Sequence, residues 1–214
     1  IGLCCAGLLL SCGGGDLLSV IPGVGTGGTG SVAGTVTGLG SVIVDGQSYD
    51  DSQATLERQP DLQQSESLDS SDLQVGQYVY LTLDASGQPT RVQLASQLVG
   101  SVTEVTPAAA RLRVAGQTVW VNSDASQGPV TVFSGYASLA EIALAQPVQV
   151  YGVLQADPVD ASRELVRATR IERLVNADTL SARVTGTLVA DGTALLLAGV
   201  PLNLATITNL PANQ

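Results

Sequence analysis

The sequence predicts an all-β protein of tandem small five-stranded barrels of OB-like type, each with one short helical turn, after a signal segment and a flexible tether. Apolar and polar residues alternate in Val79–Leu83 and in Leu112–Val114, as in strands that bury one face. Short turns separate such runs, and the same pattern then returns along the chain, which indicates tandem copies of one domain. The predicted order of three strands, a helical turn and two strands also fits an SH3-like barrel or a β-sandwich.

A strand motif and the tight turn that follows it mark the repeats. Gly34–Thr37 recurs as Gly100–Thr103 and, more loosely, as Gly186–Val189. The following turns contain Asp45-Gly46 and Ala115-Gly116, which supply the positive φ angle that a tight hairpin requires. These landmarks divide the chain into a first barrel repeat at 33–97, a second at 98–175 and a partial third at 182–214.

Each complete repeat has a helical turn before its fourth strand. Ser138 and Glu141 have capping-box spacing, in which both side chains satisfy free N–H groups at a helix start. The first repeat has Asp69–Asp72 at the equivalent place. Where the first copy has Tyr78, the second has Pro147, which lacks the N–H donor of a strand ladder. We therefore expect Pro147 at a sheet edge or as the first residue of a strand.

The N-terminal segment has the pattern of an exported and acylated protein. The apolar residues 1–10 are too few to span a bilayer, which takes about 20 residues, and they fit the apolar core of a signal peptide. The run Leu9-Leu10-Ser11-Cys12 resembles the lipobox of bacterial lipoproteins. That resemblance implies cleavage before Cys12 and acylation of its sulfur.

We accordingly expect residues 1–11 to be a signal-peptide remnant and residues 12–32 to be the lipidated cysteine with a Gly/Ser/Thr tether. A short buried helix or strand is the alternative for the apolar run, but a triglycine at 13–15 is an unusual continuation of a core element. Gly13, rather than an aspartate, follows the cysteine, which resembles the pattern of lipoproteins sent to the outer membrane.

Four stretches of the repeats carry a second resemblance. They are Gly34–Gly46 with Tyr49–Asp51 in the first copy, and Gly116–Val119 and Ala168–Glu172 in the second. These stretches resemble an uncharacterised family of bacterial lipoproteins known as a domain of unknown function (the 5666 family). The resemblance covers most of the chain after the tether and implies a secreted lipoprotein with tandem small β domains. The family has no established activity, so the resemblance assigns no catalytic residue.

The composition limits the chemistry that the chain can perform. It contains no His and no Lys, and therefore no imidazole base, histidine metal ligand or Schiff-base lysine. Cys4 and Cys5 lie in the segment to be removed and Cys12 would carry lipid, which leaves no thiol for a disulfide or a nucleophile. We therefore predict no enzyme and no cofactor. The net charge of -10 would repel phosphate backbones, so we predict no nucleic-acid partner.

Aromatic and acidic side chains provide the candidate sites. Aromatic residues combine a large apolar surface with a polar edge, which suits ligand binding. For Trp120, core packing or an inter-domain contact is the favoured interpretation. The possible ligand-binding residues are Tyr49, Tyr78, Tyr80, Trp120 and Tyr151. Asp69 and Asp72 are weak calcium candidates, because the acidic segment around them lacks the D-x-D-x-D-G order of a calcium loop. We predict no other metal ligand.

A group of arginines near the end of the second repeat allows two interpretations. Such a basic strip could meet lipid headgroups, acidic glycan or a partner protein. Cross-strand ion pairs with Glu164 and Glu172, worth about 0–1 kcal/mol each, are the simpler explanation. The arginines are Arg163, Arg167, Arg170 and Arg173.

Together these features predict a membrane-anchored envelope lipoprotein that acts as a non-enzymatic binding or scaffolding module. Its predicted partners are the membrane, through the lipid anchor, and an envelope protein or glycan. The predicted location is the bacterial cell envelope, at the outer membrane on its periplasmic or surface face. The alternatives are a glycan-binding or enzyme-accessory module that uses exposed aromatics and, third, a hydrolase-type enzyme.

Replacement of Cys12 tests the anchor directly. In cells that express the full-length protein and are fed an alkyne-tagged fatty acid, we expect the wild type to carry the label and to partition with membranes. Cys12→Ala removes the acylated sulfur and should lose both properties, whereas Cys5→Ala should keep them. A Cys12→Ala protein that still partitions with membranes would contradict the prediction.

Overall fold

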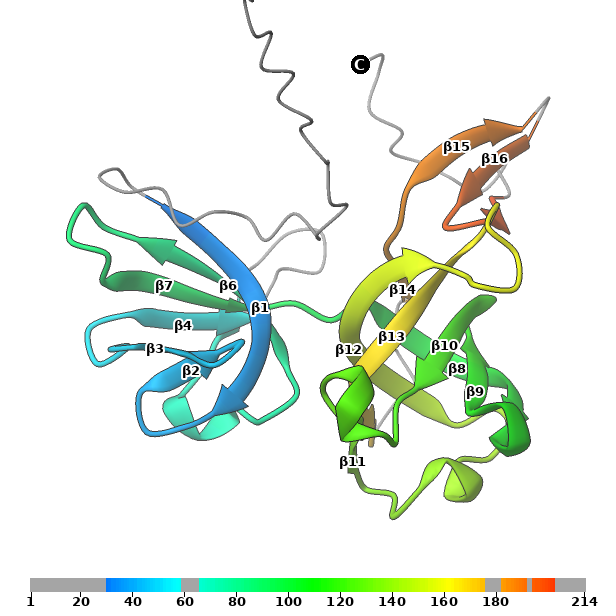
Figure 1. Ribbon diagram of the computed structural model, residues 1–214, viewed down its shortest axis with the longest axis horizontal. Helices are drawn as coiled ribbons and strands as arrows, with labels where there is room; N and C mark the ends of the chain where they lie inside the picture. The colour runs from blue at the N-terminus through cyan, green and yellow to red at the C-terminus, as the bar shows by residue number, and fades with distance from the viewer. Residues whose placement is uncertain (1–29, 59–65, 176–181, 192–193, 203–214) are drawn as a thin grey trace, which may run out of the picture.

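The computed structural model describes residues 30–58, 66–175, 182–191 and 194–202, which form an all-β molecule, as predicted (Figure 1). Two sheets of seven strands make two units, drawn at the left and right of Figure 1, and a small three-stranded sheet lies beyond the second. Helical structure in these residues is limited to four 3-10 helices of three residues each. Within the described ranges no helix is long and apolar enough to cross a membrane.

The first unit contains seven strands and one 3-10 helix. They are β1 (Ser31–Gly38), β2 (Val42–Val44), β3 (Gln47–Tyr49), β4 (Thr55–Arg58), β5 (Glu66–Ser67), η1 (Ser70–Asp72), β6 (Tyr78–Leu83) and β7 (Pro89–Leu94). The strand order in the sheet is β3-β2-β1-β6-β7-β4-β5. Neighbours are antiparallel except for β4 and β7, which run parallel.

The second unit is a closed barrel. Its elements are β8 (Leu98–Thr106), η2 (Pro107–Ala109), β9 (Arg111–Val114), β10 (Gln117–Val121), η3 (Ala125–Gln127), β11 (Val132–Ser134), η4 (Leu139–Glu141), β12 (Pro147–Ala156) and β13 (Glu164–Arg173). The sheet runs in the order β10-β9-β8-β12-β13-β11, and β10 also pairs in parallel with β13. The strands β8, β9, β10, β13 and β12 therefore form a complete ring, which confirms the predicted five-stranded barrel for this unit.

The length of one strand explains why only the second unit closes. β13 has ten residues, and its part at Leu165–Ala168 pairs with β10. β7 has only six residues and begins at Pro89, so it has no segment equivalent to that part. In the described part of the first unit β3 pairs only with β2. A seam therefore stays open between β3 and β7.

Each unit encloses its own apolar core. Leu81 and Leu94 are fully buried in the first core, and Leu112 and Ile171 in the second. The predicted alternation is present, since Val79, Leu81 and Leu83 point inward on β6 while the residues between them are more exposed. The connection between the two cores, Ala95–Gln97, is itself buried.

The predicted tight turn occurs three times with nearly the same geometry. Asp45, Ala115 and Ala198 have φ angles of 49°, 49° and 52°, and the glycine after each also has a positive φ. The N–H groups of these three residues donate to the carbonyls of Thr35, Ser101 and Thr187, at 2.9, 3.2 and 2.9 Å. Each acceptor lies in, or just before, the strand that pairs with the one leading into the turn. Two successive positive φ angles are the requirement of a two-residue hairpin, so the repeated turn follows from its sequence.

A second repeated device leads into β6 and β12. Gly76 and Ala145 both have positive φ, and their N–H groups donate to Val36 and Val102 at 2.8 Å. The next residue is glutamine in both copies, and its side-chain oxygen accepts a backbone N–H three residues earlier, at 2.7 and 3.0 Å. Pro147 comes next in the second copy and is the first residue of β12, one of the two places predicted for it.

The predicted helical turn in the second unit is the 3-10 helix η4, with Ser138 as its N-cap residue. The predicted capping box is wrong in detail. The Ser138 side chain makes no cap hydrogen bond, and Glu141 accepts instead from the N–H of Ala137 at 2.8 Å.

The segment predicted as a partial third repeat is described as far as residue 202, except for residues 192–193. Its strands are β14 (Arg183–Val184), β15 (Leu188–Asp191), β16 (Ala194–Leu197) and β17 (Val200–Pro201). β14 joins the second unit by pairing with β8, and the others form the sheet β15-β16-β17. Thr187 binds Glu164 through its N–H and hydroxyl, at 2.8 and 2.7 Å, which ties this piece to β13.

The two positive-φ positions before β6 and β12 predict opposite responses to substitution. Ala145→Gly relieves a left-handed backbone that costs an L-residue about 1–2 kcal/mol, partly offset by about 0.4–1 kcal/mol of added freedom in the unfolded chain. We therefore expect a small rise in the urea unfolding midpoint. Gly76→Ala should lower it by more, because its Cβ would lie 2.7 Å from the carbonyl oxygen of Thr169.

Gly87→Ala is the matched control for that pair. Gly87 also has a positive φ, but a Cβ there meets nothing within 4 Å, so only the backbone penalty remains. A Gly76→Ala protein no less stable than the Gly87→Ala protein would show that the close approach to Thr169 is unimportant.

Candidate functional site

The aromatic residues predicted as ligand contacts lie at four separate places. Tyr78 and Tyr80 lie together on β6, Trp120 lies on the outer face of β10, Tyr49 lies at the open seam, and Tyr151 is buried between the units. Cys12 lies outside the described residues. The structure thus brings together only the pair on β6.

Tyr151 has no exposed surface and cannot be a surface ligand contact in this conformation. Its hydroxyl makes no hydrogen bond of ordinary geometry among the described residues, although Arg58 lies close enough to stabilise its charged form. Burial raises the pKa of Tyr151 to about 12, and the negative charge of Glu172 adds to the shift. Arg58 and Arg170 oppose the shift electrostatically. The position of these charges places Tyr151 where the two units meet.

The two units are docked through the turn before β6. The Thr169 hydroxyl donates to the carbonyl of Gly76 at 2.6 Å, and Arg170 Nη1 donates to the carbonyl of Val75 at 3.0 Å. Arg170 is buried and also forms an ion pair with Glu172. Arg170 therefore connects the two units. It does not belong to an exposed basic strip, which the sequence had allowed as one of two interpretations.

A β-bulge produces this arrangement. β12 and β13 pair as Tyr151↔Arg170 and Gly152↔Ala168, so Thr169 has no partner residue. The extra residue reverses which side chains point outward beyond it. Arg167 and Ile171 consequently occupy opposite faces of the barrel wall, with Ile171 fully buried in the core.

A cleft lies at the junction of the two units and contains the predicted pair of tyrosines. The Tyr78 and Tyr80 rings are 5.6 Å apart, in an edge-to-face arrangement with an interplanar angle of 78°. Tyr80 is 42% exposed, and Val153 on the opposite wall is 45% exposed. The cleft has a volume of about 350 Å³ and is lined by Tyr78, Tyr80, Ala95, Ser96, Gln97, Val153, Leu154 and Thr185.

The polar groups of this cleft are held in place. Thr185 Oγ1 donates to the carbonyl of Gln97 at 3.0 Å and also contacts its side-chain oxygen. The N–H of Gln97 donates to the carbonyl of Val150 at 2.9 Å. Burial is the main cause that raises the pKa of Tyr78 above its ordinary value. The cleft therefore presents fixed aromatic, hydroxyl and amide groups, and the Arg183 guanidinium lies 3.5 Å from the Ser96 hydroxyl at its edge.

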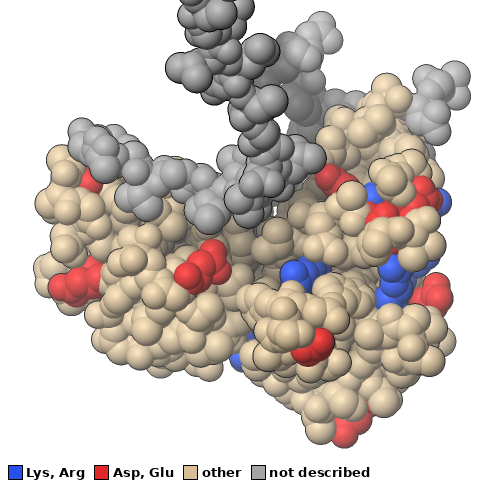
Figure 2. All heavy atoms as spheres, in the orientation of Figure 1, with Lys and Arg blue, Asp and Glu red and all other residues tan. Residues whose placement is uncertain are grey.

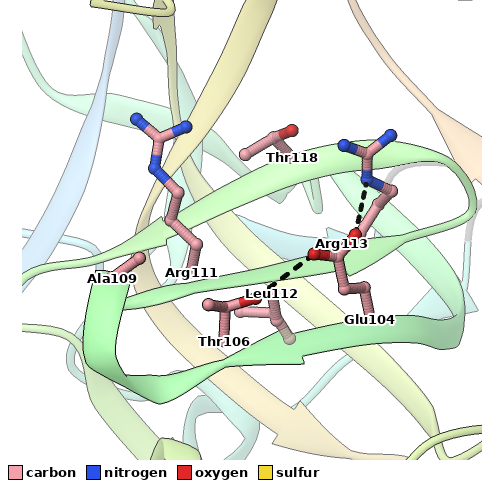
Figure 3. A pocket seen from close by; sticks show the side chains of 7 residues that line it. All are labelled: Glu104, Thr106, Ala109, Arg111, Leu112, Arg113 and Thr118. Atoms are coloured by element: carbon pink, nitrogen blue, oxygen red, sulfur yellow. Dashed lines mark hydrogen bonds and ion pairs between the residues drawn. The ribbon is translucent and has the colours of Figure 1, made fainter. Parts of the chain in front are cut away.

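The outer face of the second barrel collects arginines around Trp120. Trp120 pairs with Arg111 on β9 and with Arg167 on β13, so an arginine flanks it on each side. Figure 3 shows the side chains of Arg111, Arg113 and Thr118 on this face above a shallow hollow. In Figure 2 charged atoms form small separate areas on a surface that is mainly uncharged.

Two of these arginines have a carboxylate partner. Arg111 binds Asp157 through two hydrogen bonds of 3.1 and 3.2 Å, and Arg113 lies 3.6 Å from Glu104. Burial would raise the pKa of Asp157, but the N–H of Val159 and the Arg111 guanidinium outweigh it and keep the pKa below its ordinary value. Arg167 has no such partner among the described residues.

Four aspartates with lowered pKa values are accounted for by local turns. In each case hydrogen bonds from the serine two residues later stabilise the charged carboxylate and lower the pKa. The hydroxyls of Ser86 and Ser126, for example, donate to Asp84 and Asp124 at 2.7 Å. These Asp-x-Ser turns close loops, so their shifted pKa values point to structure rather than to acid–base chemistry. The four aspartates are Asp50, Asp84, Asp124 and Asp160.

The calcium hypothesis gains no support from the geometry. Asp72 accepts the N–H of Asp69 at 2.9 Å and so stabilises the start of η1. In the described ranges no three acidic or other ligating side chains lie close enough to hold a metal ion. Tyr49 lines a separate shallow hollow with Asp50 and Gln88 at the open seam, and its ring packs on the first core.

Comparisons of the chain with protein-family models, curated protein sequences and solved structures gave no match. The geometry of the cleft and of the Trp120 face therefore carries the functional argument.

The buried phenol of Tyr151 predicts a response to alkaline pH. The folded state holds its proton up to a pKa of about 12, against about 10 in an unfolded chain. This contribution to stability is complete below about pH 10 and is lost as the pH rises through about 12. Tyr151→Phe removes the ionisable group, so its free energy of unfolding should fall less between pH 9 and 12 than that of the wild type, as measured by urea unfolding. Tyr49→Phe, at the half-buried seam, is the control and should follow the wild type. An identical pH profile for Tyr151→Phe and wild type would contradict the assigned pKa.

Proposed function

We propose that this protein is an envelope lipoprotein, acylated at Cys12, whose tandem OB-like barrels serve as a non-enzymatic binding module. The ring of five strands in the second unit, with its single parallel pair, supports an OB-like assignment. The same pairing order in the first unit, apart from the open seam, supports a tandem arrangement. Membership of the 5666 family is part of this proposal and rests on the sequence motifs.

The cleft between the units is the observation on which the binding proposal depends. Binding sites are concave and mainly apolar, with a few fixed polar groups that orient the ligand. The cleft is concave and about equally polar and apolar, because Tyr80 and Val153 offer exposed apolar surface while Ser96, Gln97 and Thr185 supply polar groups. The docking at Gly76 fixes the two walls of the cleft relative to each other, so the protein loses little conformational freedom when a ligand binds.

Glycan binding is the second candidate function, and one feature of the cleft favours it. Sugar rings have apolar C–H faces that pack on aromatic rings and hydroxyl groups that need hydrogen-bond partners. The edge-to-face pair of Tyr78 and Tyr80 beside Gln97 and Thr185 offers both kinds of group in one cleft. The lipid anchor and tether would hold this cleft close to the envelope polymers.

Photo-crosslinking in intact cells tests the binding proposal. A photoreactive amino acid at position 80 should capture a defined envelope component, because Tyr80 faces the cleft. The same amino acid at position 144 is the matched control, since Leu144 is 65% exposed but lies outside the cleft. Equal capture at both positions, or capture at neither, would contradict the proposal.

Co-sedimentation with purified peptidoglycan sacculi tests the glycan candidate. We expect the wild type to sediment and Tyr80→Ala to lose most of this binding, by about tenfold, since a well-placed aromatic contact is worth about 1–3 kcal/mol. Leu144→Ala should sediment like the wild type. A wild-type protein that stays in the supernatant would remove peptidoglycan as the ligand.

A further inference from the structure

Two hydrogen-bond donors of the Arg167 guanidinium have no acceptor among the described residues. Its Nε and Nη2 atoms are buried and have no hydrogen-bond partner in the part of the chain that the structure describes. An arginine side chain cannot lose its charge at any physiological pH, so deprotonation does not relieve this situation. Buried donors without acceptors are unfavourable, so the observed conformation of this side chain costs free energy.

These two donors have the geometry of a specific receptor. Nε–H and one N–H of Nη2 lie parallel on one edge of the guanidinium plane, which matches the two oxygens of a carboxylate. The neighbouring arginine on this face also binds a carboxylate through two donors, in its case Nη1 and Nη2. Arg111 holds the Asp157 carboxylate with two hydrogen bonds of 3.1 and 3.2 Å, while Arg167 holds none.

The surroundings of Arg167 add an aromatic surface. Its Cζ lies 5.2 Å from the centre of the Trp120 ring, on the adjacent parallel strand. On the other side Gly128 leaves room for the guanidinium, because a Cβ at that position would lie 2.7 Å from Nη2. Arg167 thus lies between Trp120 and Gly128 and covers the ring. Turning it away from Gly128 would free both the donor pair and the ring.

We propose that Arg167 and Trp120 form a binding site for a uronic-acid residue of an acidic glycan. The carboxylate takes the Nε and Nη2 donors of Arg167, and the sugar ring packs on Trp120. One guanidinium balances one negative charge, so a singly charged carboxylate fits better than a doubly charged phosphate monoester. A flexible acidic peptide offers carboxylates but no ring for Trp120.

Tryptophan fluorescence gives a direct readout, because Trp120 is the only tryptophan in the chain. We expect trigalacturonate to change the emission of the wild type in a saturable way and to bind less tightly as salt is raised. Its fully methyl-esterified form, which has the same ring and no charge, should bind at least about tenfold more weakly. Inorganic phosphate and an aspartate-rich peptide should not compete.

Three variants separate the proposal from a general charge effect. Arg167→Gln should weaken trigalacturonate binding at least about tenfold, and Arg167→Lys should fail to restore it, because lysine lacks the paired donors. Arg91→Gln removes the same charge from the first unit, where Arg91 is more than half exposed, and should bind normally. Far-UV circular dichroism and thermal unfolding establish that each variant is folded.

Several results would overturn the proposal. These are an unchanged emission of the wild type at millimolar trigalacturonate, equal binding of the methyl ester, binding by Arg167→Lys like the wild type, or equally tight binding of phosphate or the acidic peptide. The site is separate from the cleft between the units, so Tyr80→Ala should bind trigalacturonate normally. Failure of the cleft proposal would therefore leave this one standing, and the reverse also holds.

Discussion

The docking of the turn at Gly76 onto β13 determines the shape of the surface that the two units share. Thr169 and Arg170 donate to the carbonyls of Gly76 and Val75, and a side chain at Gly76 would collide with the Thr169 backbone. Because these bonds come from a bulged residue and its neighbour, they fix both the distance and the rotation between the units. The cleft that contains Tyr80 exists only as long as this docking holds.

The two units share their turns and differ in one length, and that difference changes their surfaces. The ten residues of β13 close the second barrel and place Arg167 beside Trp120. The six residues of β7 leave the first sheet open and supply no equivalent position. A single lengthened hairpin thus accounts for both the closed ring and the distinctive outer face, while the shared turns keep the two cores alike.

Local features of this fold follow from the sequence, and features that depend on long-range pairing do not. The tight turn at Ala115 and the start of β12 at Pro147 depend on neighbouring residues, so they could be predicted. Tyr151 was named as a possible ligand contact because nothing in its own strand shows that another unit covers it. The contact of Arg167 with Trp120 was also missed, because the sequence does not show the bulge at Thr169 or the parallel pairing of β10 with β13.

The shortness of β3 limits self-association of the protein through the open edge of its first sheet. An unpaired strand edge offers N–H and C=O groups to a neighbouring molecule and promotes association through added strands. β3 presents only three residues, of which Gln47 and Ser48 are exposed and polar. The Gln47 side chain also donates to the carbonyl of Ser48 at 3.3 Å, so it occupies an acceptor that an incoming strand would need. The first unit can therefore leave its sheet open without becoming a template for aggregation.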